Sequence, residues 1–249
     1  MNDKEKLDDL FGKLAEGIKD GKISPEDFRT LFMPADSLNT EHIEDFLDTN
    51  FPDDNGRVLH EMLSEKIHLD VFYRNPAENR PYYVLMTSGM SDLPMTFDED
   101  CGDEFIKDHS RAELMMFLPP DWDMDSKDEC WFWPIRALKA SARFPHLCDT
   151  WIGHGHDIQF TEPCEPFADN TKLCSMLFTR PHDEKLRFIE GEDGEKINIY
   201  VAVPIYEEEM NFKIPLENGG DALLEKLFGT GEIPVERYVV DINRKNVCL

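Results

Sequence analysis

The residues most able to do chemistry gather in one short stretch, residues 144–157, which holds three histidines, a cysteine and two aspartates. His154 and His156 form an H-x-H pair, and such a pair on an extended backbone can present both imidazoles to one metal ion. The remaining ligands could come from three side chains: Asp157, Cys148 and Cys164. A metal held in this way would support a metal-assisted hydrolase.

A simpler interpretation gives the same stretch a structural role. Gly153 and Gly155 favour a tight turn in which the histidines hydrogen-bond locally, and Trp151 then belongs to the core. No second His or carboxylate motif stands at ligand spacing elsewhere in the sequence. We therefore expect no metal and no other cofactor.

Nucleophilic catalysis by Cys148, with His146 as its base, is a further chemistry to consider. Side chains two positions apart lie on the same face of a strand but diverge from each other, and the sequence identifies no oxyanion donors. We expect no catalytic residue here and no enzymatic activity.

The aspartates Asp121, Asp123 and Asp125 resemble the start of a calcium-binding loop. The sixth position, however, is Ser126 where a sharp turn needs glycine, and the twelfth is Phe132 where a bidentate glutamate is required. The sequence also lacks the zinc-protease, phosphate-loop, dinucleotide-binding and serine-hydrolase motifs. These absences remove the common routes to metal, phosphate and acyl chemistry.

The chain has 249 residues, with 26 Lys and Arg against 52 Asp and Glu, so its formal net charge is −26. Nucleic acids and anionic membranes would be repelled by this charge. Apolar residues make up 41% of the chain, with 17 Phe, 6 Tyr and 4 Trp, which is enough for a packed core. The six cysteines are at least ten positions apart and no signal or membrane segment is visible, so we expect reduced thiols and a cytoplasmic location.

Three helices are predicted before residue 66, and two more follow later. Apolar residues recur at helical spacing from Leu7 to Ile18, and Ser24-Pro25 caps a second helix that runs to Phe32. A third helix follows Thr40 and closes before Pro52. The later helices are expected to begin at Trp133-Pro134 and to cover Ala222–Phe228.

The rest of the chain is rich in strands. Short segments of β-branched and aromatic residues, bounded by Pro, Gly, Asn or Asp, predict strands at Ile67–Tyr73, Tyr82–Thr87, Ala112–Leu118, Leu173–Thr179, Leu186–Ile189, Ile197–Ile205 and Arg237–Ile242. The sequence Gly191-Glu-Asp-Gly194 is typical of a hairpin turn, which makes part of the sheet antiparallel. We expect an α+β fold in which helices flank a mixed, largely antiparallel sheet, with a short helical N-terminal extension.

Acidic residues concentrate between Asp98 and Glu129, where twelve carboxylates face only Lys107, Arg111 and Lys127. The apolar strand expected at 112–118 lies in the middle of this window, so two acidic loops should flank one buried strand. The simpler interpretation is a solubilising surface, and the alternative is a patch that steers a basic partner.

Several passages, taken in order, resemble the Suppressor of fused domain. They are Tyr73–Pro76, Tyr83–Asp92, Glu113–Pro119, Trp133-Pro134 leading to Ala142–Phe144, Thr150-Trp151 with Gly153–His156, and Asp241–Arg244. No single passage is specific, but the ordered set is. The resemblance runs from about residue 67 to the end, which suggests a helical extension at 1–66 and a Suppressor of fused-like domain at 67–249.

The resemblance implies a protein-binding domain without enzymatic activity. In animal members a second domain follows, and the two domains clamp an extended segment of a Gli-type zinc-finger transcription factor as an added strand. This sequence stops at Leu249, and it has Phe144 and Gly155 where the animal proteins place a Tyr and an Asp near the peptide site. We therefore expect no binding of a Gli-like peptide. Single-domain bacterial relatives, by the same resemblance, act as immunity proteins that neutralise polymorphic toxins of their own strain.

The functional expectation is a cytoplasmic protein-binding domain, an immunity protein whose partner is a basic toxin domain. The alternatives are a metal-assisted hydrolase around His154 and His156, and an orphan regulatory module with another protein partner. The candidate protein-binding residues are Phe144, His146, Trp151, His154, His156, Asp157, Asp121, Asp123 and Asp125. We expect the loop from Phe144 to Asp157 at one end of the sheet on an accessible face, with Trp151 mostly buried and His154 exposed.

Overall fold

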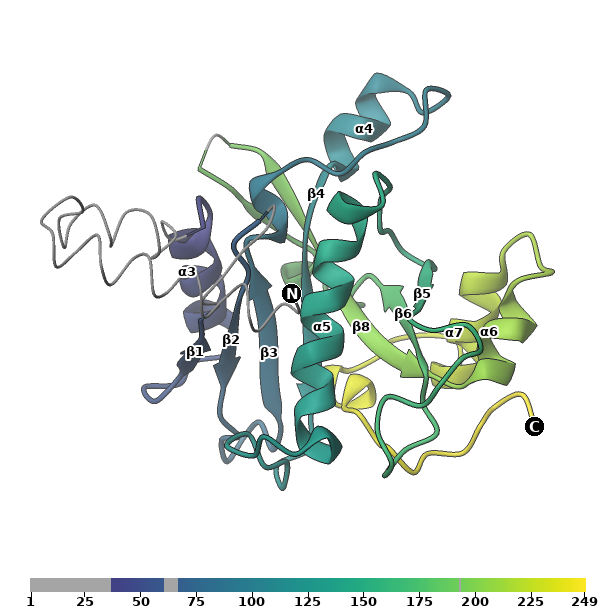
Figure 1. The fold of residues 1–249 in the computed structure, drawn as a ribbon. Coiled ribbons are helices and arrows are strands. Elements are labelled where there is room, and N and C mark those ends of the chain that lie inside the picture. The colour runs from purple at the N-terminus through teal and green to yellow at the C-terminus, as the bar shows by residue number, and fades with distance from the viewer. Residues whose placement is uncertain (1–36, 61–66, 193) are drawn as a thin grey trace, which may run out of the picture.

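The computed structural model describes residues 37–60, 67–192 and 194–249. At its centre is an eight-stranded sheet (Figure 1) in the order β1-β2-β3-β4-β8-β6-β5, with β7 paired to β8 outside this path. The strands are β1 (Arg57–Leu59), β2 (Asp70–Arg74), β3 (Tyr83–Ser88), β4 (Arg111–Leu118), β5 (Asp157–Gln159), β6 (Ser175–Thr179), β7 (Phe188–Glu190) and β8 (Lys196–Ile205). The pair β4–β8 is parallel and every other pair is antiparallel.

Helices cover both faces of the sheet. The α-helices are α3 (Thr40–Asn50), α4 (Asp103–His109), α5 (Glu129–Leu147), α6 (Glu207–Lys213) and α7 (Gly219–Phe228), and the 3₁₀ helices are η1 (Met90–Asp92), η2 (Glu184–Leu186) and η3 (Val235–Tyr238). Helix α5 crosses one face, as Figure 1 shows, while α3, α6 and α7 pack against the other. No helix within the described ranges is long and apolar enough to cross a membrane.

The central strand β4 is covered on both faces, which explains the almost continuous apolar run in its sequence. Leu114 and Met116 belong to the core beneath α5, whereas Met115 and Phe117 belong to the core on the opposite face. A strand that is covered on both faces has no solvent side, so its sequence shows no polar alternation. Every residue from Ala112 to Leu118 is buried.

Helix α5 begins four residues earlier than predicted. Its N-cap is Asp128, whose side chain accepts a hydrogen bond from the amide of Cys130 at 2.9 Å. Pro134 has no N–H to give to the carbonyl of Cys130, and the side-chain amide of Asn170 donates to that carbonyl instead, at 2.9 Å. The proline is therefore tolerated inside the helix rather than marking its start.

The structure confirms the predicted α+β class and its mixed, largely antiparallel sheet. Helix α3 appears where the third N-terminal helix was expected, and Gly191–Gly194 does join the antiparallel strands β7 and β8. The two helices predicted at 7–18 and 24–32 lie outside the described residues.

One predicted strand is wrong. Residues 237–242 were expected to form a strand, but η3 occupies the start of that segment and only Val239 makes a bridge, to Phe117. The apolar residues Tyr238 and Val240 are buried in the core, and this burial explains the apolar pattern that predicts a strand here. The sequence also failed to predict β1, β5, α4 and α6, all of which are three to seven residues long.

Residues placed in the N-terminal extension contribute to the sheet itself. Strand β1 pairs antiparallel with β2, and Ile43 and Leu47 of α3 are fully buried in the core below β2 and β3. The sheet thus includes β1, and its core includes the buried side of α3, both upstream of the passages that carry the resemblance.

Candidate protein-binding surface

The turn between α5 and β5, residues 148–156, lies at the end of the sheet where β6 ends. The amide of Gly155 donates to the carbonyl of Phe178 at 2.8 Å, and the amide of Phe178 donates to the carbonyl of His156 at 2.9 Å. Two residues therefore oppose one, which makes a β-bulge. Gly155 has a φ of +82°, a conformation that favours glycine.

Both ring nitrogens of His154 are engaged in contacts within the chain. The amide of Arg180 donates to Nδ1 at 3.1 Å, so Nε2 carries the proton and donates to Asp221 of α7 at 3.0 Å. The hydroxyl of Thr179 lies 3.2 Å from Nδ1. His154 is exposed, as predicted, but its nitrogens are not free to bind a metal.

His156 lies against Trp151, with ring centroids 4.3 Å apart. Burial lowers the pKa of His156, and the nearby cation of Lys213 acts in the same direction, so the imidazole is neutral at physiological pH. Trp151 is mostly buried, as predicted, because its ring lies against Gly153, His156 and Phe97. Within the described ranges, no three His, Cys, Asp or Glu side chains are close enough together to hold a metal.

Helices α6 and α7 brace this turn. Asp157 forms an ion pair with Lys213 of α6, and the Lys213 ammonium also donates to the carbonyl of Gly155 at 2.7 Å. The backbones of Gly155 and Gly220 nearly touch, since a Cβ on Gly220 would lie 2.5 Å from the Cα of Gly155. The Asp157 side chain is only 14% exposed, so its carboxylate mainly holds α6 against the turn.

Two candidate residues lie in helix α5 and not in the predicted loop. His146 is buried, and its Nε2 lies 2.9 Å from the carbonyl oxygen of Met90. Phe144 is half-buried and packs against the core. Cys148, the helix C-cap, is exposed. Since His146 is directed into the protein, the structure does not assemble the His146–Cys148 pair considered from the sequence.

The acidic residues occupy opposite ends of β4. Asp121, Asp123 and Asp125 are exposed in the loop after the strand, and Asp125 pairs with Arg57 at 3.2 Å. The other acidic residues, at 98–108, lie in α4 and the loop before it, at the start of the strand. The structure therefore places Asp121, Asp123 and Asp125 away from the turn that holds His154.

An aromatic cluster joins α4 to this turn, and the sequence did not reveal it. Trp151 stacks on Phe97 with centroids 5.0 Å apart, and Phe105 of α4 meets both rings edge to face, at 5.6 Å and 6.0 Å. His109 stacks on Phe105 and accepts a hydrogen bond from the Arg180 side chain at 2.8 Å. Phe97 and Phe105 are 46 and more residues before Trp151, so only tertiary structure brings them together.

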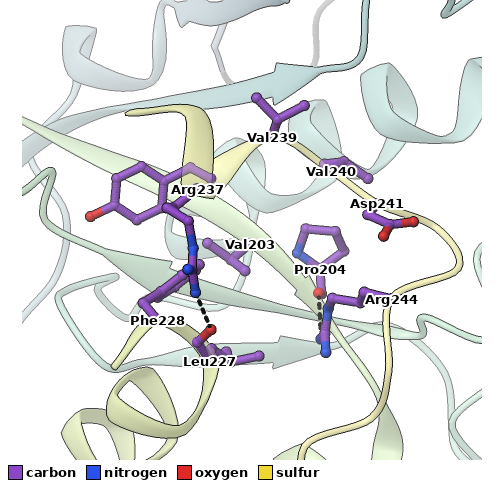
Figure 2. A pocket seen from close by; sticks show the side chains of 10 residues that line it. Val203, Pro204, Leu227, Phe228, Arg237, Val239, Val240, Asp241 and Arg244 are labelled. Carbon is purple, nitrogen blue, oxygen red and sulfur yellow. Dashed lines mark hydrogen bonds between the residues drawn. The ribbon is translucent and has the colours of Figure 1, made fainter. Parts of the chain in front are cut away.

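A separate hollow of about 200 Å³ lies where the sheet opens, shown in Figure 2. Strands β4 and β8 pair only as far as Met115 and Val201, beyond which Phe117 pairs with Val239 instead. Val203, Pro204 and Phe228 line the gap that results. At its rim the Arg244 side chain donates to the Pro204 carbonyl at 3.1 Å and forms an ion pair with buried Glu209. Arg244 is therefore already engaged within the chain.

Comparison with known families identifies this architecture. The model of the Suppressor of fused protein family matches residues 65–245. The chain belongs to the Suppressor of fused family. No curated protein has a sequence similar enough to match this chain.

Solved structures of other family members share the fold. The crystal structure of the Sufu–Fu complex aligns with a TM-score of 0.58 at 15% identity, covering 86% of this chain and 93% of that one. A Suppressor of fused homologue from Neisseria gonorrhoeae gives 0.56 at 17% identity, covering 84% and 96%. Suppressor of fused from Drosophila gives 0.60 at 14% identity, covering 85% of this chain but only 52% of its own length.

The structure explains why this Suppressor of fused chain has glycine at position 155. A side chain there would be strained by the positive φ, and its Cβ would lie 3.3 Å from the backbone of Gly220. Any side chain at this position, including the carboxylate that the resemblance places here in animal proteins, would press on the backbone of α7. Phe144 likewise offers no hydroxyl at the neighbouring position in α5.

Proposed function

We propose that this protein is a non-enzymatic, cytoplasmic protein-binding module that acts as an immunity protein by neutralising a basic toxin domain of the same strain. The observation that carries the proposal is the Suppressor of fused fold, which in the Sufu–Fu structure belongs to a protein crystallised as a complex with another protein. The resemblance to single-domain bacterial members gives the immunity role.

Charge supports a basic partner. The net charge of −26 creates a field that attracts cationic proteins over long distances and repels nucleic acids. Both ends of β4 carry exposed carboxylates, so a basic domain would be attracted from either direction. Contacts at short range must then select the partner.

The geometry gives less support to the metal-assisted hydrolase. His154 donates to Asp221 and accepts from Arg180, and His156 packs against Trp151, so the two imidazoles serve the fold. Metal analysis of the purified protein tests this alternative. Stoichiometric zinc that disappears in a His156→Ala variant would favour the hydrolase over the binding module.

The immunity role predicts that a toxin domain is encoded next to this gene, and that domain is the partner for the test. We expect co-expression of this chain to restore growth of cells that produce the toxin, and the two purified proteins to form a stable complex. Growth restored without any complex would contradict direct neutralisation. A stable complex with a different cellular protein, and none with the toxin, would favour the orphan regulatory module.

A further inference from the structure

The aromatic cluster and the exposed carboxylates next to Phe97 and Phe105 in the sequence are here called, together, the aromatic–acidic face. It consists of the rings of Phe97, Phe105 and Trp151 with the carboxylates of Asp98, Glu99, Asp103 and Glu104. Helix α4 stands out from the body of the molecule in Figure 1. The face combines Trp151, a residue expected to bind protein, with acidic residues distant in sequence.

Helix α4 is largely exposed to solvent. None of its residues is buried, and Phe105 is 40% exposed although it is a large apolar side chain. A seven-residue helix is not stable alone, so tertiary contacts must keep it in place. These are the ring contacts of Phe105 and His109, and the bonds of Asp108 to Lys196 and Asn198 of β8, each at 2.8 Å. Its outer side is thus an unpartnered helix surface with a partly exposed aromatic ring.

The carboxylates of this face have no cation of their own. Among the described residues, no Lys, Arg or His forms an ion pair with Asp98, Glu99, Asp103 or Glu104. Three cations lie nearby. Lys196 pairs with Asp108 at 2.8 Å and Arg180 donates to His109, while Lys107 is exposed on α4 itself and forms no ion pair within the described residues.

We propose that the aromatic–acidic face binds an arginine-rich, extended segment of the protein partner. This inference rests on the proposed function and names the surface and the chemistry of that contact. A guanidinium can stack on an aromatic ring and donate two parallel hydrogen bonds to a carboxylate, and the face offers both groups together. Lysine lacks the planar group for such stacking. A second copy of this chain is a poor occupant, because each copy carries a charge of −26.

The test uses fluorescently labelled octa-arginine and octa-lysine peptides, with binding to the full chain followed by fluorescence anisotropy at about 0.15 M salt, where charges more than about 8 Å apart are screened. We expect octa-arginine to bind more tightly than octa-lysine. The double variant Asp98→Asn/Glu99→Gln should weaken octa-arginine binding by about fivefold or more, because it removes two of the four carboxylates.

The matched control is Asp121→Asn/Asp123→Asn, which makes the same change in net charge at the other end of β4. We expect it to weaken binding by less than about twofold. Equal losses in the two double variants would show that the peptide responds only to overall charge and would overturn the proposal.

A ring variant tests the aromatic part. Phe105→Leu keeps an apolar side chain to hold α4 but removes the ring, so it should reduce the preference for arginine over lysine by about threefold or more. Phe105→Ala should show the same loss, and circular dichroism of both variants reports whether the fold is intact. A folded Phe105→Leu protein that keeps the full preference would contradict the role of the ring.

The same variants separate this inference from the proposed function. If the toxin domain binds the native chain but Asp98→Asn/Glu99→Gln and Phe105→Leu leave that affinity unchanged, the aromatic–acidic face is not the contact and the immunity role stands. If the toxin does not bind at all while the peptide results hold, the immunity role fails and the face remains an arginine-binding surface.

Discussion

At the scale of single residues, Glu113 shows how one buried carboxyl group organises a turn. Its side chain is fully buried and accepts hydrogen bonds from the hydroxyl of Thr87 (2.5 Å), the amides of Gly89 (3.0 Å) and Ser91 (2.9 Å), and the hydroxyl of Ser91 (2.7 Å). These bonds fix η1 against β4. Burial raises the pKa of Glu113 above its ordinary value, although the hydrogen bonds act in the opposite direction.

Glu113→Ala should destabilise the protein strongly, because it leaves four buried donors without an acceptor. We expect a loss of about 3 kcal/mol or more in the free energy of unfolding, measured by urea denaturation. Glu113→Gln keeps one acceptor oxygen and should lose much less. If the alanine variant were as stable as the glutamine variant, the four hydrogen bonds would not matter for stability.

The raised pKa of Glu113 also predicts a pH dependence. The protonated form is favoured in the folded state, so the stability that this group contributes is full below the unfolded pKa of 4.5 and is lost as pH rises towards the folded value. Glu113→Gln lacks this titration. Urea denaturation of both proteins from pH 4 to neutral pH should therefore show the variant gaining stability relative to the native chain. A difference that does not change with pH would contradict the raised pKa.

Gly155 carries a second prediction at this scale. Gly155→Ala should cost about 1–3 kcal/mol, because a Cβ meets both a φ of +82° and the Gly220 backbone at 3.3 Å. Gly194→Ala is the matched control, with a φ of +72° but only an ordinary contact of 3.5 Å to the Glu190 side chain. The free energy of unfolding should fall further in Gly155→Ala, and equal losses would exclude a role for the contact with Gly220.

At the scale of elements, the Lys213–Asp157 ion pair joins helix α6 to strand β5. Both side chains are 14% exposed, so removing one leaves a largely buried charge without its partner. Lys213→Met should lower the free energy of unfolding by about 2–4 kcal/mol. The loss in the double variant Lys213→Met/Asp157→Asn should be smaller than in Lys213→Met alone, because no unpaired charge remains. Additive losses in a double-mutant cycle would mean that the two residues act independently.

At the scale of the whole molecule, the acidic surface should govern how fast a basic partner arrives. Asp121→Asn/Asp123→Asn/Asp125→Asn should slow association with the toxin domain at low salt and flatten its salt dependence. The fold should remain intact, because the three carboxylates are exposed and the Arg57–Asp125 pair is solvated. Stopped-flow kinetics at low and moderate salt measure this effect. Unchanged rates at both salt concentrations would make the acidic loop merely solubilising.

The lifetime of the complex should depend on short-range contacts instead. Apolar and aromatic contacts control dissociation, whereas distant charges act mainly on association. The acidic loop at 121–125 and the aromatic–acidic face lie at opposite ends of β4, so a charge change at the first and a ring change at the second should affect different rate constants.

The sequence determined the fold class and the central elements because their signals are local. Buried strands such as β4 and β8 are long apolar runs, and α3 shows helical periodicity, so the class, the hairpin at 191–194 and most strands could be predicted. The short elements α4, α6, β1 and β5 carry too few residues for a period to emerge. The ordered resemblance also gave the family from sequence alone.

Tertiary structure decided what the candidate residues do. His146 and His154 are eight positions apart, yet the first is buried within α5 and the second bridges Arg180 and Asp221 at the surface. Phe105 and Trp151 meet only because β4 and α5 both place their neighbouring loops at one end of the sheet. Burial and contacts between distant residues depend on how elements pack, and the packing partner of a side chain is not encoded in its own stretch of sequence.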